Sequence, residues 1–169
     1  HEIDAQLILS DIMKVEREYL ITNNKAHISE KMKEQYDIAI SRRIKKEPVA
    51  YITGKKEFWS TDFLVNYKTL IPRPETELLV YRLIGYFKNK KINILDIGTG
   101  SGCILLSILK ELNNSRGIGI DISYKAVQVA KKNSKKLNLS NRAKFKVFDM
   151  DKFYLGKYDL IVSNPPYIP

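Results

Sequence analysis

The chain has 169 residues, of which 44% are hydrophobic and 28% charged, the composition of one ordinary globular domain or of two small ones. No apolar stretch is as long as a membrane span and no secretory signal is visible, so we expect a cytoplasmic protein without a membrane segment. One cysteine excludes an internal disulfide, and together with two histidines it makes no cluster of metal ligands.

The net charge of +10 lies entirely in the second half of the sequence. Residues 1–80 hold 13 Lys and Arg against 13 Asp and Glu, whereas residues 81–169 hold 16 against 6. Such an excess is typical of a surface that meets an anionic partner, such as RNA or a ribosome-bound complex. A sequence rich in Lys, Ile and Asn is also typical of an AT-rich genome, and the charge alone leaves both explanations open.

The N-terminal part has the apolar spacing of amphipathic helices. The first predicted helix carries its apolar residues at Ile3, Leu7, Ile8, Ile12 and Val15. A turn signal at residues 22–24 separates it from a second helix, for which Ser29 is the predicted N-cap and which Pro48 brings to an end. We predict a helical N-terminal domain of residues 1–47.

Residues 48–71 change from a helical to a strand-like pattern and are predicted to form a β-hairpin that links two domains. The strand-like segments are residues 50–52, 57–59 and 62–65. Pro72, Pro74 and neighbouring acidic residues then open a predicted helix of about residues 75–87, since acidic side chains stabilise a helix N-terminus.

Strands and helices alternate in the remainder, which we assign to a second domain of residues 72–169. The predicted strands are residues 92–97, 117–122, 143–148 and 158–163, and the predicted helices between them are residues 102–112 and 124–137, the latter with Ser123 as N-cap. This alternation predicts an α/β fold whose parallel sheet is covered by helices on both faces.

Each of these strands is followed by glycines or by a polar side chain. The residues are Gly98, Thr99, Gly100, Ser101 and Gly102 after the first strand, Asp121 at the end of the second, Asp149 with Met150 after the third, and Asn164 after the fourth. Because open parallel sheets bind ligands at the carboxyl ends of their strands, we expect these residues to share one site.

The glycine spacing differs from the dinucleotide-binding pattern, and the loop lacks the lysine of a phosphate-binding P-loop. Asp121 stands where an acidic residue accepts ribose hydroxyls, and Asp149 can accept the amino group of an adenine while Met150 packs on the ring. An adenosine ligand without a pyrophosphate fits these features, and S-adenosylmethionine is such a ligand.

Residues 164–167 read Asn-Pro-Pro-Tyr and directly follow a buried strand. The two prolines fix φ and remove two backbone donors, so the turn cannot continue the strand. It presents the Asn164 amide and nearby carbonyl groups outward, where they can hold a planar –NH2 group while Tyr167 covers its face. Asn164 would then face the methyl group of the donor.

Together these motifs resemble class I S-adenosylmethionine-dependent methyltransferases, and more closely the HemK/PrmC family. The resemblance runs from about residue 3 to the end and rests on residues 47–54, 57–59, 70–77, 96–102 and 164–167. Enzymes of this family methylate the side-chain nitrogen (N5) of the glutamine in the Gly-Gly-Gln motif of peptide chain release factors. The resemblance implies a Rossmann-like sheet, and an N-terminal helical domain that recognises the substrate.

The resemblance also implies roles for individual residues, and it implies a site that uses no metal. Those implied to bind the donor are Gly98, Thr99, Gly100, Ser101, Gly102, Asp121, Asp149, Met150 and Asn164. Those implied to bind the glutamine are Arg73, Asn164, Pro165, Pro166 and Tyr167, of which Asn164, Pro165 and Tyr167 are the catalytic set. Met150 stands where relatives often carry a bulkier residue.

Two other functions remain open at this stage. An amino methyltransferase acting on nucleic acid, for example at adenine N6, uses the same Asn-Pro-Pro-aromatic chemistry on a flipped base, and the basic charge suits it. A fragment that binds the donor or docks on a protein without turnover is the second. It arises because a complete sheet of this class has seven strands and only about four are accounted for in the sequence, which leaves open whether further strands follow Pro169.

Overall fold

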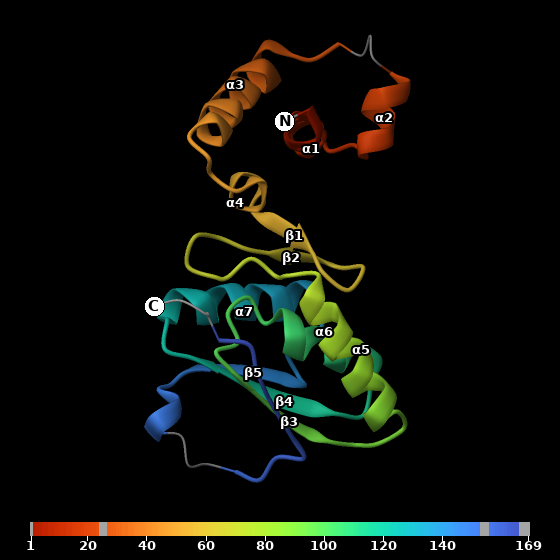
Figure 1. Cartoon of the computed structure of the whole chain (residues 1–169), viewed down its shortest axis with the longest axis vertical. Coiled ribbons are helices and arrows are strands. Elements are labelled where there is room, and N and C mark those ends of the chain that lie inside the picture. The colour runs from red at the N-terminus through yellow and green to blue at the C-terminus, as the bar shows by residue number, and fades with distance from the viewer. Residues whose placement is uncertain (1, 24–26, 153–155, 166–169) are drawn as a thin grey trace. The chain divides into compact units, whose positions relative to one another are not determined.

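A computed structural model describes residues 2–23, 27–152 and 156–165 of the chain. The chain divides into two compact units, His1–Gly54 and Lys55–Pro169. The first unit is helical and the second contains the hairpin and the larger sheet (Figure 1).

The first unit contains four described helices. They are α1 (Glu2–Met13), α2 (Arg17–Thr22), α3 (Glu30–Ile44) and α4 (Val49–Thr53). The predicted N-cap is confirmed, because the Ser29 side chain accepts the Met32 backbone N–H at the start of α3. Arg43 Nε lies 2.8 Å from Asp4 Oδ2 and joins α3 to α1. Ile8 is buried within this unit.

The strand predicted at residues 50–52 is wrong, because these residues lie in α4. Pro48 precedes the helix with a φ of −58°, and Gly54 follows it with a left-handed φ of 73°. Proline at a helix start and glycine just past its end favour a single helical turn between them. These two residues outweigh the strand preference of the Tyr-Ile pair.

The predicted hairpin is confirmed, and its first strand begins two residues earlier than expected. β1 (Lys55–Glu57) pairs antiparallel with β2 (Asp62–Leu64). Trp59 and Ser60, which the sequence analysis divided between a strand and a turn, both form the turn, with φ values of 53° and 47°. The flanking Phe58 and Thr61 exchange backbone hydrogen bonds of 3.0 and 3.1 Å. This is the geometry of a two-residue hairpin turn with both central φ angles positive.

The second unit contains a parallel sheet of four described strands in the order β5-β4-β3-β6. The strands are β3 (Asn93–Ile97), β4 (Arg116–Asp121), β5 (Ala143–Val147) and β6 (Leu160–Ser163). The helices of this unit are α5 (Glu75–Phe87), α6 (Cys103–Glu111) and α7 (Tyr124–Lys136), with the short 3-10 helix η1 (Met150–Lys152) after β5. These elements confirm the predicted alternation and the parallel α/β fold.

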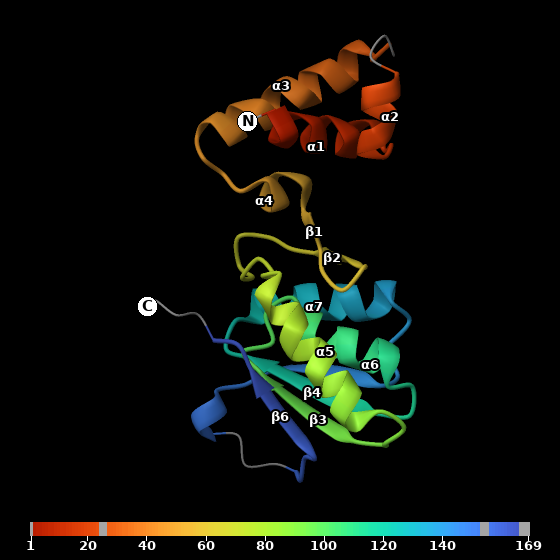
Figure 2. The ribbon, with the colours of Figure 1, turned by 45° about the vertical axis from the view of Figure 1, so that its right-hand side comes forward.

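The helices α5, α6 and α7 lie on one face of the sheet (Figures 1 and 2). The core between them contains Ile94, Phe145 and Val162 from the sheet and Leu105 from α6, all buried. On the opposite face Ile161 of β6 is 60% exposed. Helices over both faces therefore remain a prediction, since those of the described residues cover one.

Candidate functional site

The four parallel strands bring the predicted site residues to one edge of the sheet. β4 and β5 lie on one side of β3, whereas β6 lies on its other side and runs parallel to it. The strand order therefore reverses between β3 and β6, which makes this a topological switch point. Ligands of open α/β sheets bind at such a point, outside the carboxyl ends of the strands. The glycine loop follows β3, Asp121 ends β4, and Asn164 follows β6.

Glycines at positions 98 and 100 face open space. Both have left-handed φ angles, 68° and 54°, and hydrogen bonding holds the loop, with the Thr99 N–H donating to the Ile120 carbonyl. A Cβ placed on Gly98 would meet no atom within 4 Å, and one on Gly100 only the Gly98 carbonyl oxygen at 3.9 Å. The backbone here is therefore open to close approach by a ligand.

Gly102 has a different function in the same loop. A Cβ at this position, where φ is 80°, would lie 3.1 Å from Phe145 and 3.2 Å from both Ala130 and Leu106. Gly102 therefore allows α6 to start close against α7 and β5. The loop thus combines two glycines that leave space with one that permits tight packing.

Asp121 fastens the glycine loop to the end of β4. Its Oδ2 accepts the Gly100 N–H at 2.9 Å and its Oδ1 accepts the Ser123 N–H at 2.8 Å. An ionised carboxylate can accept about four hydrogen bonds, so both oxygens retain capacity for hydroxyl groups. The half-buried Asp121 is therefore held rigidly in the place where a ribose acceptor was predicted.

Asp96 precedes the glycine loop and holds it through a buried hydrogen bond, a contact that the sequence did not predict. It is 1% exposed, and its Oδ2 accepts the Thr99 hydroxyl at 2.6 Å. Burial raises the pKa of Asp96 to about 7, against the opposing effect of the Thr99 hydrogen bond. Its position in the quoted motif was visible in the sequence, but its burial was not.

Asp149 and Met150 lie just beyond β5. The Asp149 Oδ1 accepts the backbone N–H of Asp151, inside η1, at 3.1 Å. Met150 is 60% exposed, so its side chain is accessible from the solvent. Both residues therefore lie at the predicted edge, and their contact with an adenine remains a prediction.

Asn164 is half-buried at the end of β6 and contacts the start of α5. Its Nδ2 donates to the Thr76 Oγ1 at 3.3 Å, and the preceding Ser163 hydroxyl donates to the Ile97 carbonyl of β3 at 3.0 Å. The turn is thereby joined both to the central strand and to α5. Pro165 is exposed, whereas the predicted site residues Pro166 and Tyr167 lie outside the described residues.

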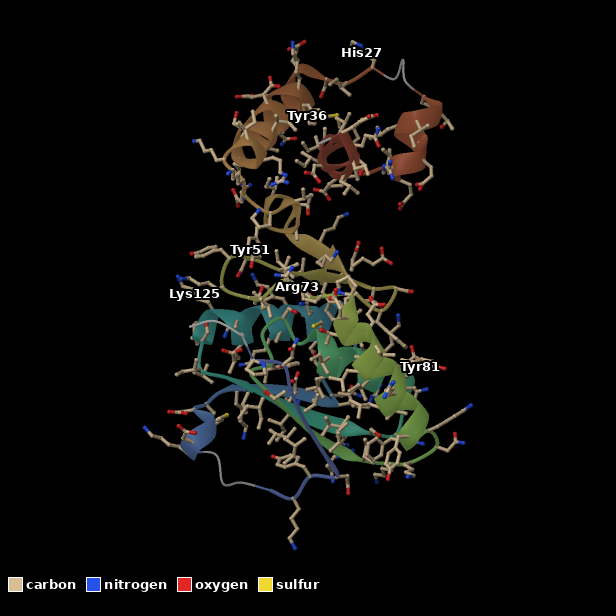
Figure 3. All side chains as sticks on the ribbon, in the orientation of Figure 1. His27, Tyr36, Tyr51, Arg73, Tyr81 and Lys125 are labelled. Atoms are coloured by element: carbon tan, nitrogen blue, oxygen red, sulfur yellow. The ribbon has the colours of Figure 1, made fainter. Side chains whose placement is uncertain are left out.

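Arg73 is exposed and lies just before α5, where Figure 3 labels it. Its carbonyl accepts the Thr76 N–H at 3.0 Å, so the backbone of Arg73 belongs to the turn that opens the helix. This placement, three residues before the partner of Asn164, keeps Arg73 a candidate for shaping the substrate entrance.

A second residue that the sequence analysis missed connects the hairpin, α7 and the glycine loop. The Asn133 side chain is fully buried, and its Oδ1 accepts the Leu64 N–H at 2.7 Å. Its Nδ2 donates to the carbonyls of Leu64 and Ser101, at 3.0 and 2.9 Å. The only sequence signal was position, since Asn133 follows Ala126 and Ala130 on the apolar stripe of α7.

Cys103, at the start of α6, packs against the core. Loss of hydration raises the pKa of the Cys103 thiol to about 12, which opposes formation of a reactive thiolate. Among the described residues, no three His, Cys, Asp or Glu side chains are grouped so as to hold a metal ion. Within the same residues, no helix has the length and apolar character needed to span a membrane.

Two protein families match the chain, in the order in which the two units follow one another. Residues 1–54 match the PrmC N-terminal domain, and residues 88–167 match a methyltransferase domain. Both units are therefore similar to parts of HemK/PrmC proteins. The PrmC N-terminal match ends where the helical unit ends, and the methyltransferase match covers β3 to β6 and all residues of the predicted site except Arg73.

Curated relatives match over almost the whole chain. The release factor glutamine methyltransferase of Buchnera aphidicola subsp. Schizaphis graminum is 42% identical over 98% of this chain and 60% of its own length. The protein of the same name from Clostridium acetobutylicum is also 42% identical, over 98% of this chain and 59% of its own length. A bifunctional methyltransferase of Rickettsia typhi is 38% identical over 99% of this chain and 36% of its own length.

The chain thus spans about 60% of the length of the release factor glutamine methyltransferases that it matches. These matches show a similarity to HemK/PrmC proteins over that part of their length.

Proposed function

We propose that this protein is a cytoplasmic enzyme that transfers a methyl group from S-adenosylmethionine to the side-chain nitrogen (N5) of the glutamine in the Gly-Gly-Gln motif of peptide chain release factors. The observation that carries the proposal is the sheet edge itself, where an open glycine loop, Asp121 and Asn164 come together in a chain similar to PrmC proteins. The activity and the substrate named for the relatives agree with it.

Donor binding is assigned to the loop after β3 and to the ends of β4 and β5. Space at Gly98 and Gly100 admits the methionine part, and Asp121 accepts the ribose hydroxyls. Asp149 and Met150 contact the adenine. The remaining residues assigned to this site are Thr99, Ser101, Gly102 and Asn164. Bound there, S-adenosylmethionine supplies an electrophilic methyl group.

Substrate binding is assigned to the Asn-Pro-Pro-Tyr turn. The Asn164 Oδ1 and the Pro165 carbonyl accept hydrogen bonds from the glutamine –NH2, and Pro166 and Tyr167 complete the site, with Tyr167 stacking on the amide plane. Arg73 lines the entrance, and the helical unit docks the release factor. Residues 1–47, 48–71 and 72–169 remain our proposed division into recognition, linker and catalytic parts.

The mechanism follows from the chemistry of an amide. Its nitrogen is a poor nucleophile because the lone pair is delocalised into the carbonyl group. Acceptors on both –NH2 hydrogens stabilise positive charge that develops on nitrogen in the transition state. Holding that nitrogen in line with the transferable methyl group supplies the proximity effect. The proton leaves after methyl transfer, to water, so the site requires no histidine base.

The nucleic-acid alternative is less well supported, since the N-terminal domain of the family and the names of the relatives favour a protein substrate. Contact between the basic second half and RNA or a ribosome remains a prediction.

The test is a methylation assay with the protein at its full natural length. The protein is incubated with labelled S-adenosylmethionine and recombinant release factor, either with the Gly-Gly-Gln motif intact or with its glutamine changed to alanine. We expect one methyl group per intact factor and none on the altered one. DNA and RNA are assayed in parallel, and label found only in nucleic acid would refute the proposal.

A further inference from the structure

The first turn of α5 lies beside the proposed catalytic asparagine. This turn contains Thr76, whose half-buried side chain accepts a hydrogen bond from Asn164 Nδ2 at 3.3 Å. The two residues are 88 positions apart in the sequence. The contact therefore connects the turn that opens α5 to the residue that follows β6.

The turn that carries Thr76 is fixed from several directions. Pro72 is buried, and Pro74 opens the helix with φ −56° and ψ −36°. The Glu77 N–H donates to the Pro74 carbonyl at 2.9 Å, while the Glu77 side chain accepts the Trp59 N–H from the hairpin turn at 3.0 Å. The Thr76 hydroxyl is therefore presented from a rigid support.

An asparagine amide has two ends of similar shape and opposite hydrogen-bonding character. Only Oδ1 can accept a hydrogen bond from a substrate –NH2 group, because Nδ2 is itself a donor and two donors facing each other form no hydrogen bond. When Nδ2 donates to Thr76, the orientation of the amide is set and Oδ1 occupies the opposite end. We propose that Thr76 is the positioning residue that holds Asn164 in this orientation for catalysis.

The inference rests on the proposed function only for what Asn164 does to the substrate. The orientation itself is a property of the two side chains. The separation of 3.3 Å is long for a hydrogen bond, and such catalytic contacts often shorten when the substrate is bound.

Two variants separate the hydroxyl group from the shape of the side chain. Thr76→Val keeps the branched shape and removes the acceptor, whereas Thr76→Ser keeps the acceptor. Thr61→Val is the matched control, because its hydroxyl also accepts a hydrogen bond, from Lys110 Nζ at 2.7 Å, but lies in the hairpin turn. Donor affinity is measured for all three by calorimetry.

The first readout is independent of activity. The side-chain amide signals of Asn164 are assigned in nitrogen-15 spectra by their loss in Asn164→Ala. We expect Thr76→Val to shift these signals and to lower the order parameter of the group, and Thr76→Ser to leave both close to the wild-type values. Unchanged Asn164 signals in Thr76→Val would overturn the proposal.

The second readout is methylation of the release factor. We expect Thr76→Val to lower kcat by about tenfold with donor affinity unchanged, the loss of one hydrogen bond in the transition state. Thr76→Ser and Thr61→Val should stay within about twofold of the wild type. Equal loss in Thr76→Ser and Thr76→Val would assign the effect to packing and overturn the proposal. If the wild type methylates no release factor, the proposed function fails, and the Asn164 spectra still decide whether Thr76 positions the amide.

Discussion

Replacing Asn133 with leucine tests whether one buried amide holds the glycine loop in place. Asn133→Leu keeps a side chain of similar volume but removes all three hydrogen bonds, two to Leu64 and one to Ser101. Three backbone groups then lose their partners. An unpaired buried group costs about 1–3 kcal/mol, and we use the lower end because Leu64 is only half-buried. The expected loss in the free energy of unfolding is about 3 kcal/mol.

Urea unfolding measures this loss, followed by the fluorescence of Trp59, the chain's single tryptophan. Trp59 packs against the core of the second unit and therefore reports on the part of the chain that contains Asn133. Ser134→Ala is the matched control, because Ser134 is also buried on α7 but its hydroxyl makes only a 3.5 Å contact with Ser140. The control should lose less than about 1 kcal/mol.

A loss below about 1 kcal/mol in Asn133→Leu would refute the reasoning, since it would mean that water or a shifted backbone satisfies all three groups. Equal losses in the two variants would also refute it. In the predicted case the variant also binds the donor more weakly, because the Ser101 carbonyl is no longer held.

Three further predictions concern residues at the same edge of the sheet. The folded protein keeps the Asp96 proton up to about pH 7, whereas the unfolded chain releases it near pH 4. The free energy of unfolding therefore falls as the pH rises from about 4 to about 7. The difference in free energy of unfolding between Asp96→Asn and the wild type should therefore change by about 3 kcal/mol in favour of the variant from about pH 5 to about pH 8. Urea unfolding measures it, and a difference that stays constant with pH would contradict the prediction. Gly98→Ala should lose about 1–2 kcal/mol of stability in the same assay, because alanine does not favour a left-handed φ. Gly102→Ala should lose more, because its Cβ would also crowd neighbouring side chains. Gly98→Ala should instead weaken donor binding in calorimetry, and binding equal to that of the wild type would argue against ligand approach at this glycine. Asp121→Asn should weaken donor binding by about tenfold, and unchanged affinity would exclude it as the ribose acceptor.

Most of the secondary structure was predictable from the sequence because its causes are local. The helix Glu75–Phe87 follows from the prolines and acidic residues at its start, and the N-cap Ser123 follows from capping chemistry; both are confirmed. The error at Val49–Thr53 was also local, since a short apolar segment has no reliable period, and the flanking proline and glycine decided it. Trp59 was assigned to a strand instead of the turn because an aromatic residue favours β structure and does not favour a positive φ.

The sequence by itself indicated the resemblance to the HemK/PrmC family, the alternation of strands and helices, and which residues follow the strands. Glycine, proline, capping residues and apolar period act within a few positions of the chain, so they can be recognised without coordinates. Only the tertiary structure decided the contact of Thr76 with Asn164, the three hydrogen bonds of Asn133 and the burial of Asp96. These depend on the strand order and on the packing of helices against the sheet, which bring together side chains as far as 88 residues apart.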